Sequence, residues 1–345
     1  METTWFVIVT VMLAMYVVLD GFDFGVGIVY PFVARTETER QIVRASLGPI
    51  WNANEVWLIA AGAVLFFAYP KAYAAGFSGF YLALILVLWL LIFRGLALEL
   101  RGQVNHVLWK QAWDMAFSTS SALLAIVFGT ALGNLIRGVP LNEDGYFFVP
   151  FWTDFQPGSA PGILDWFTVL LGLTSAVVLA FHGANYLVTK AEGALYQRAV
   201  STAWVLGWVS AGCTALTVMA VPMVQPNLSL NFTRHPVVYL APVIGIIALG
   251  YSLYFRLCRR DLSAFLASCV FIFLMLSSVM FGMHPYILVS TTDLMFSLTV
   301  YNAATNSYGL SVGIVWFVVG ALLILACQIY LYSRFPGKTQ SDDAH

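Results

Sequence analysis

Hydrophobic residues run in long, uninterrupted stretches along most of this chain. At a helical rise of about 1.5 Å per residue, each stretch can cross about 30 Å of hydrocarbon, and the second is the shortest. Because the stretches are continuous rather than alternating, they predict helices and not the strands of a barrel. We therefore expect an all-α polytopic membrane protein with about nine transmembrane helices, at about 5–32, 50–68, 74–97, 113–136, 163–188, 198–221, 236–256, 262–284 and 311–333.

The composition supports a membrane protein. The chain has 345 residues, of which 60% are hydrophobic and only 10% are charged, whereas soluble domains carry about 25% charged residues. The net charge is −1, and without a basic stripe we expect no nucleic-acid partner. The four cysteines form no CxxC pair and lie in or beside apolar stretches, which is typical of packing residues rather than disulfides or metal ligands.

The distribution of lysine and arginine predicts the orientation. Placing the N-terminus outside leaves only Lys71, Arg137 and Arg234 in outer connections, out of sixteen Lys and Arg residues. The long connections 138–161 and 285–310 then face outward, and we expect the first to be an ordered or semi-ordered loop rather than another span. The tail 334–345 is cytoplasmic, and we expect it to be mobile from Gly337 onward. The first stretch is too long for a signal peptide and should be retained.

A faint internal repeat suggests two halves within one membrane domain, 1–345. The first stretch reads Leu19-Asp20-Gly21-Phe22-Asp23 and the fifth reads Phe181-His182-Gly183-Ala184-Asn185. Each places a polar residue before a glycine and another two residues beyond it. We predict two pseudo-repeated four-helix bundles, 5–136 and 163–284, followed by a ninth helix at 311–333. Chance similarity is the alternative.

Four polar residues are predicted to meet in the inner half of the membrane. Asp20 lies about 22 Å beyond Trp5 along the first helix, and Glu55 lies about 9 Å inside the start of the second. Asp20 and Asp23 are three residues apart and share a helix face, and Asn52 and Glu55 do likewise. Because consecutive helices are usually neighbours, we expect these four side chains to form one cluster that opens toward the cytoplasm.

Buried acids of this kind have two interpretations. Burial favours the neutral form of a carboxyl group, so such acids can hold and pass protons, which indicates a proton-entry route. The alternative is a structural knot of hydrogen bonds, with the acids paired to Arg44 or capping the second helix. At the end of the third helix, Arg94 could pair with Glu55 or act as a positive-inside anchor, and Glu99 and Arg101 are further ion-pair candidates at the interface.

The sequence contains no recognisable haem, metal or hydrolytic motif. His182 is the only histidine clearly inside a stretch, and no second ligand follows at a metal-binding spacing. A hydrogen-bonded core histidine is the safer interpretation. We therefore expect no redox centre and no catalytic residue in the isolated chain.

Five segments resemble the second subunit of the cytochrome bd-type quinol oxidases. The resemblance is specific over roughly residues 15–140, and the length and the order of elements are also similar. The matching segments are Asp20–Gly27, Thr38–Arg40, Gly48–Leu58, Phe77–Tyr81 and Phe93–Arg101.

This resemblance implies a haem-free subunit that pairs with a haem-bearing subunit I. The partner carries haem b and haem d and the quinol site, and the complex oxidises quinol and reduces dioxygen to water with cytoplasmic protons. The resemblance also implies the bacterial or archaeal cytoplasmic membrane. Small single-helix subunits, membrane lipids or a structural quinone are further partners that it allows.

The resemblance also assigns roles to individual residues. Asp20, Asn52 and Glu55 lie where the family leads protons toward the oxygen-reducing haem, and Trp57 matches a tryptophan near the proposed oxygen passage. One departure matters, because the family usually has Asp at the position of Asn52 and Asn cannot ionise. Either Glu55 and Asp20 take over, or water does, or this route is not functional here.

Two other functions compete with the oxidase subunit. A proton-coupled secondary transporter would need a substrate site at broken helices in both halves, and the second half is nearly free of embedded charge. A purely structural scaffold would use every acid for packing or capping.

Overall fold

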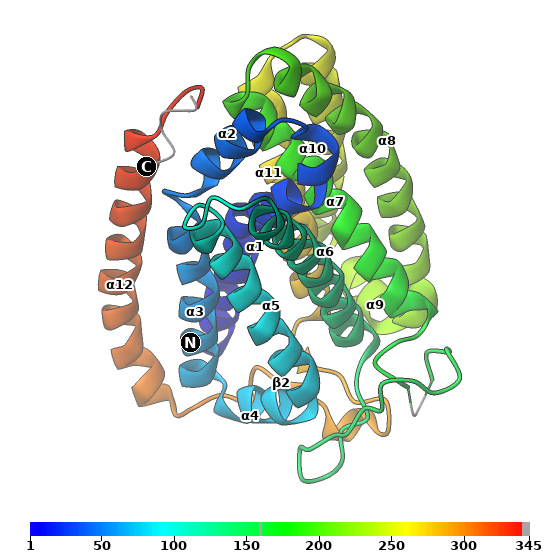
Figure 1. The fold of residues 1–345 in the computed structure, drawn as a ribbon. Coiled ribbons are helices and arrows are strands. Elements are labelled where there is room, and N and C mark those ends of the chain that lie inside the picture. The colour runs from blue at the N-terminus through cyan, green and yellow to red at the C-terminus, as the bar shows by residue number, and fades with distance from the viewer. Residues whose placement is uncertain (159–160, 340–345) are drawn as a thin grey trace.

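The computed structural model describes residues 1–158 and 161–339 and consists almost entirely of helices (Figure 1). Within these residues, nine helices are long and apolar enough to cross a membrane, which confirms the predicted all-α polytopic fold. These helices are α1 (Glu2–Val33), α3 (Trp51–Ala68), α5 (Tyr81–Leu100), α6 (Val107–Arg137), α7 (Trp166–Lys190), α8 (Gly193–Val224), α10 (Leu240–Leu257), α11 (Asp261–Met283) and α12 (Ser307–Arg334).

Short elements join the spans. The third predicted stretch is wrong at its start, because a break at Phe80 separates α4 (Pro70–Gly79) from α5. A window average of hydropathy cannot detect such a break between two apolar helices. The other short elements are α2 (Glu37–Leu47), α9 (Pro226–Arg234), the 3₁₀ turns η1 (Pro236–Tyr239) and η2 (Leu294–Phe296), and the antiparallel strands β1 (Tyr286–Leu288) and β2 (Leu298–Thr299).

Helix α1 forms the centre of the bundle. It packs against α3, α6, α7 and α11, and every residue from Asp20 to Gly27 is buried. Small residues permit the closest of these contacts, since Gly25 of α1 meets Gly183 of α7 backbone to backbone. The central position of α1 explains how two carboxylates near its middle become shielded from the surface. The proposed division into two four-helix halves stays a prediction.

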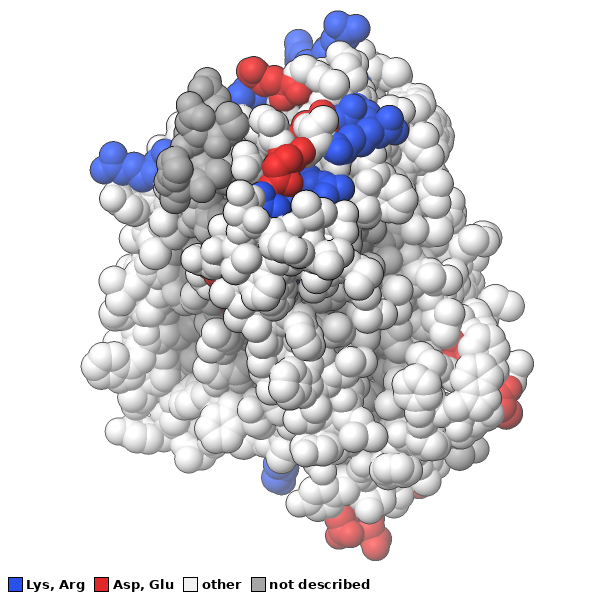
Figure 2. Space-filling model, in the orientation of Figure 1, with Lys and Arg blue, Asp and Glu red and all other residues white. Residues whose placement is uncertain are grey.

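Charged side chains gather at one end of the molecule, around α2, which we call the charged end (Figure 2). Asp114 of α6 accepts hydrogen bonds there from the hydroxyl of Tyr30 (2.5 Å) and from Arg40 (3.0 Å) and Arg101 (2.5 Å). Arg101 also donates to both carboxylate oxygens of Glu37. These bonds, together with the burial of Leu47 on its apolar face, fix α2 against α5 and α6.

The start of the C-terminal tail is bound to the charged end. The amine of Lys338 donates to the carbonyl oxygens of Val188 and Ala191, both at 2.9 Å, and the amide of Thr339 donates to Lys190. A cation at a helix C-terminus satisfies free carbonyls and complements the helix dipole. The mobility expected from Gly337 onward stays a prediction, since these bonds involve only residues 338 and 339 and residues 340–345 lie outside the described part of the chain.

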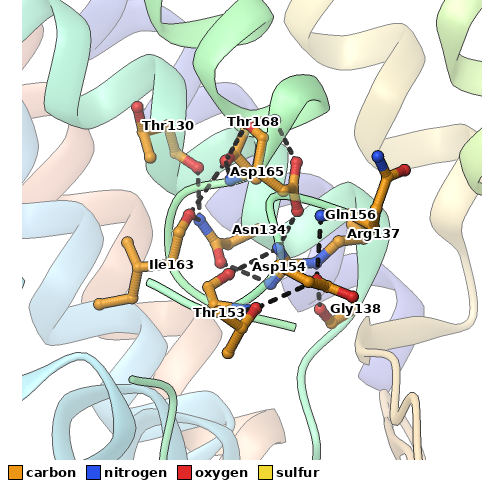
Figure 3. A network of polar contacts seen from close by, with 11 residues as sticks. Thr130, Asn134, Arg137, Gly138, Thr153, Asp154, Gln156, Ile163, Asp165 and Thr168 are labelled. Carbon is orange, nitrogen blue, oxygen red and sulfur yellow. Dashed lines mark hydrogen bonds and ion pairs between the residues drawn. The ribbon is translucent and has the colours of Figure 1, made fainter. Parts of the chain in front are cut away.

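A buried arginine organises the opposite end of the bundle (Figure 3). Arg137, at the last turn of α6, donates to the carbonyl of Gly162 (2.8 Å), to the side chain of Asn134 (2.7 Å) and to Asp165. Asp165 also caps α7 by accepting from the amide of Thr168 (2.8 Å). This network holds the connection after α6 against the bundle, and the described part of 138–161 contains no helix, as predicted for an ordered loop.

Candidate functional site

Arg94 of α5 lies at the centre of a buried ionic cluster. Its two terminal nitrogens donate to Asp20 of α1 and to Glu55 of α3, each at 2.7 Å. The side chains of Arg94 and Asp20 have no exposed surface. The ring of Phe24 lies 4.6 Å from the guanidinium carbon and covers it. One side chain therefore ties three spans together and brings two of the predicted acids to a single point.

Asp23 belongs to a neighbouring set of hydrogen bonds. The side-chain amide of Asn54 in α3 donates to Asp23 at 3.0 Å. The oxygen of the same amide accepts from Gln328 and Tyr332 of α12, again at 3.0 Å. In the sequence Asn54 stood out only as part of a motif, and its role was not identified there.

Asn52 does not join the cluster, so the predicted meeting of all four polar residues is wrong in this respect. Its side chain is exposed, whereas Asn54 is fully buried. The reason is helical geometry, since two residues correspond to about 200° of rotation and place Asn52 opposite Asn54. Glu55 lies between the two faces, and its side chain is 23% exposed.

Several buried polar atoms around the cluster form no hydrogen bond of normal geometry within residues 1–158 and 161–339. They include the second carboxylate oxygens of Asp20 and Asp23, the hydroxyl of Tyr16 and the indole nitrogen of Trp57. Buried polar atoms are nearly always hydrogen-bonded, so these atoms have free capacity for water or for a shared proton. Trp57 itself is buried in an apolar cluster that also contains Tyr16 and Phe24.

The remaining ion-pair candidates lie apart from this site. Arg101 pairs with Glu37 and Asp114 at the charged end. Glu99 is exposed and forms no ion pair within the part of the chain that the structure describes. The acid near the start of α6, Asp114, was missed at the level of sequence, although a lone acid between apolar residues was a usable signal.

The second half, predicted to be nearly free of embedded charge, contains a buried arginine at the end of one span. Arg256 of α10 is buried and donates to Asn185 of α7 (2.5 Å) and to Asp261 (2.8 Å). Its place at the very end of a predicted stretch made it resemble an interfacial anchor. Nearby, His182 contacts Ser268 (2.7 Å) and the carbonyl of Val18 (3.0 Å). Since a carbonyl only accepts, the ring nitrogen that faces Val18 carries the hydrogen.

No group of three or more His, Cys, Asp or Glu side chains that could hold a metal occurs among residues 1–158 and 161–339. An apolar cavity of about 450 Å³ lies between α6, α7, α8, α10 and α11. Its walls include Leu171, Phe271 and Met275, with the hydroxyl of Thr214 as one of few polar groups.

Comparison with known proteins places this arrangement in a family. The family model described as cytochrome bd terminal oxidase subunit II matches residues 1–335, and the chain therefore belongs to that family. It is thus a subunit of a quinol oxidase, an oxidoreductase complex of the bacterial membrane, and the family partner is the haem-bearing subunit I. This membership does not favour the transporter alternative.

Individual relatives cover nearly the whole chain. Cytochrome bd-I ubiquinol oxidase subunit 2 of Escherichia coli K12 is 31% identical over 98% of this chain and 95% of its own length. Cytochrome bd ubiquinol oxidase subunit 2 of Bacillus subtilis 168 is 28% identical over 96% of this chain and 94% of its length. A chain of the bd oxidase structure from Geobacillus thermodenitrificans superposes with a TM-score of 0.74 at 18% identity, covering 96% of this chain and 97% of that one, which supports the fold.

Proposed function

We propose that this subunit binds no haem and feeds protons from the cytoplasm through the Arg94 cluster toward the oxygen-reducing haem of subunit I. The observation that carries the proposal is the charge balance of the cluster. The guanidinium of Arg94 pairs with the carboxylates of Asp20 and Glu55, and a third carboxylate, that of Asp23, lies in the neighbouring set of hydrogen bonds without a cation of its own. Two uncompensated charges inside a bilayer are costly, so the cluster favours holding protons that it can release in turn.

The proposal includes the orientation of the chain in the membrane. Arginine-rich ends face the cytoplasm, so the charged end would lie inside and the N-terminus outside. Asp23 lies one helical turn nearer to the charged end than Asp20 does. A proton would therefore enter near Asp23 and Tyr332 and continue through Asp20 to Glu55.

The exposed polar groups on α3 suggest where the haem-bearing subunit binds. Asn52 is exposed and Glu55 is part-exposed near the start of α3, a helix apolar enough to span the membrane. We infer that subunit I covers this face of α3 and receives protons from Glu55. Asn52 cannot ionise, so it would take part only by orienting water.

The proposal also includes molecules other than subunit I that the chain could bind or let pass. The apolar environment of Trp57 suits the passage of dioxygen, which is itself apolar. The cavity beside Phe271 suits a lipid chain or the isoprenoid tail of a structural quinone. The exposed apolar residues on the outer helices leave room for small single-helix subunits. The absence of haem is supported by His182, both of whose ring nitrogens are hydrogen-bonded.

Single neutralisations in the intact oxidase test the proton route. Glu55→Gln and Asp20→Asn should lower oxygen consumption by at least about tenfold, because general acid–base steps contribute factors of this size or more. The haem absorption spectrum should stay unchanged. Glu99→Gln is the matched control, since it neutralises an exposed acid outside the cluster. Wild-type turnover in both test variants would exclude the proton route while leaving the family assignment intact.

A further inference from the structure

Helix α12 has few contacts with the rest of the bundle. Leu310 is its one buried residue, over a helix that the structure describes in full. In Figure 1 α12 runs along the edge of the bundle beside α3, and its main helix contacts among the described residues are with α1 and α3. Because packing holds α12 weakly, hydrogen bonds contribute more to fixing its position.

These hydrogen bonds lie at three levels. At one end, the indole of Trp5 donates to the carbonyl of Leu310 at 3.2 Å. At the charged end, Lys338 binds the last carbonyls of α7. Between them, Gln328 and Tyr332, four residues apart and on one helix face, reach a single atom of α3, the side-chain oxygen of Asn54.

The convergence of two donors on one oxygen fixes the orientation of the Asn54 amide. An amide oxygen has two lone pairs, so Gln328 and Tyr332 saturate it. The amide nitrogen must then point the other way, where it donates to Asp23. Without the two donors, the amide could turn over and present its oxygen to the Asp23 carboxyl group instead.

We propose that Gln328 and Tyr332 are positioning residues, which act through Asn54 to hold a hydrogen-bond donor against Asp23. This inference rests on the proposed proton route, of which Asp23 would be the entry. Helix α12 would thus complete the entry without contributing an acid of its own. Neither residue would touch the reacting haem.

The environment of Asp23 determines which other groups share its titration. From its own helix Asp20 faces it, and from α5 Arg94 does. Tyr186 of α7 and Tyr332 of α12 also lie close enough to interact with its charge, and Cys269 of α11 lies beside Tyr332. A pH profile therefore reports this whole set, so a direct probe of the Asp23 carboxyl group is also required.

Infrared difference spectroscopy on the intact oxidase supplies that probe. The vibration of the Asp23 carboxyl group is first assigned as the band that Asp23→Asn removes. Tyr332→Phe, which deletes one hydroxyl and keeps the ring, and Gln328→Leu should each shift this band, and the double variant should shift it further. Tyr330→Phe is the control, because Tyr330 is exposed on the same helix and does not contact Asn54.

The pH profile of oxygen consumption gives the second measurement. Because the Asn54 amide donates directly to Asp23, loss of its orientation should move the midpoint of the profile in both single variants. The Tyr330→Phe profile should match the wild type. A merely structural contact would lower yield or stability without moving this midpoint.

The outcomes separate the two proposals. If the Asp23 band shifts while Glu55→Gln keeps wild-type turnover, the positioning role stands and the proton route fails. If the band stays fixed in both single variants and in the double variant, the positioning role is wrong, whatever the turnover.

Discussion

The backbones of Gly25 and Gly183 touch where α1 crosses α7. A Cβ atom on Gly25 would lie 1.8 Å from the carbonyl oxygen of Leu179, and one on Gly183 would lie 2.2 Å from the carbonyl carbon of Gly25. No side chain fits at either position. This crossing lies within two residues of Asp23 and next to His182, so it sets the distance between the polar groups of the two helices.

Alanine at this crossing should therefore prevent assembly. Gly25→Ala and Gly183→Ala each force two backbones apart. The free-energy cost should exceed the value of about 1–3 kcal/mol that is typical of ordinary overpacking. We expect little or no intact oxidase in detergent extracts, measured by haem absorbance and gel filtration. Gly62→Ala is the control, because a Cβ there meets no atom within 4 Å. Normal yields of Gly25→Ala would contradict so close a crossing of α1 and α7.

Loss of Arg94 should destabilise the subunit strongly. Arg94→Gln leaves the carboxylates of Asp20 and Glu55 without their partner, and breaking a buried ion pair costs about 3–5 kcal/mol. Arg94→Lys should be intermediate, because an ammonium group lacks the planar fork that reaches both acids.

The measurement for Arg94 is the thermal unfolding midpoint of the purified oxidase. Arg35→Gln serves as its control, since Arg35 is exposed and its side chain forms no ion pair in the described part of the chain. Combining Arg94→Gln with Asp20→Asn should recover part of the loss, because the double variant removes one of the stranded charges. An Arg94→Gln midpoint equal to that of the wild type would show that the cluster has no structural role.

Hydropathy predicted the spans well because bilayer thickness imposes a length and a polarity that a linear sequence records directly. The rotation of each helix about its axis is not recorded in this way. Asn52 and Asn54 are both polar and two residues apart, and packing of α3 against α1 decides that Asn54 is the buried one. The hydrogen bond from Gln328 to Asn54 could not be predicted from the sequence either, because it joins residues 274 positions apart.

The ends of helices were the other weakness of prediction from sequence. Arg256 and Asp114 each lie at the margin of an apolar stretch, where a charge is expected to reach water. Both are instead hydrogen-bonded to a neighbouring helix. Tertiary contacts supply the partners that make such burial tolerable, and no local pattern encodes them.

The attachment of α2 should depend on pH. Hydrogen bonds from Arg101, with further support from Lys110, lower the pKa of Glu37 from 4.5 to about 2. Because the folded-state pKa is below the unfolded value, this stabilisation is fully present above pH 4.5 and is lost as the pH falls toward 2.

The pH dependence of the unfolding midpoint checks this prediction. The difference in unfolding midpoint between the wild type and Glu37→Gln should shrink as the pH falls from 4.5 to 2. It should also shrink with added salt, since the Glu37 side chain is 43% exposed and its charge is screened. A difference that stays constant down to pH 2 would count against the Glu37–Arg101 interaction.

The Arg137 network should protect the connection between α6 and α7 from proteases. Arg137→Gln removes the ion pair to Asp165 and the bond to the carbonyl of Gly162, so the connection should open more often. Limited proteolysis of the oxidase should then cut within 138–165 several times faster than in wild type. Arg234→Gln, an exposed arginine at the same end, should leave the rate unchanged. Equal rates in all three proteins would assign the protection to other contacts.

Because ribosomes build chains from the N-terminus, α12 is synthesised after α1, α3 and α5. The ion pairs of Arg94 can already have formed while Gln328 and Tyr332 are still being translated. Until those two side chains reach the bilayer, the oxygen of Asn54 lacks both of its donors. A product terminated before α12 would therefore lack the two hydrogen bonds that orient the Asn54 amide toward Asp23.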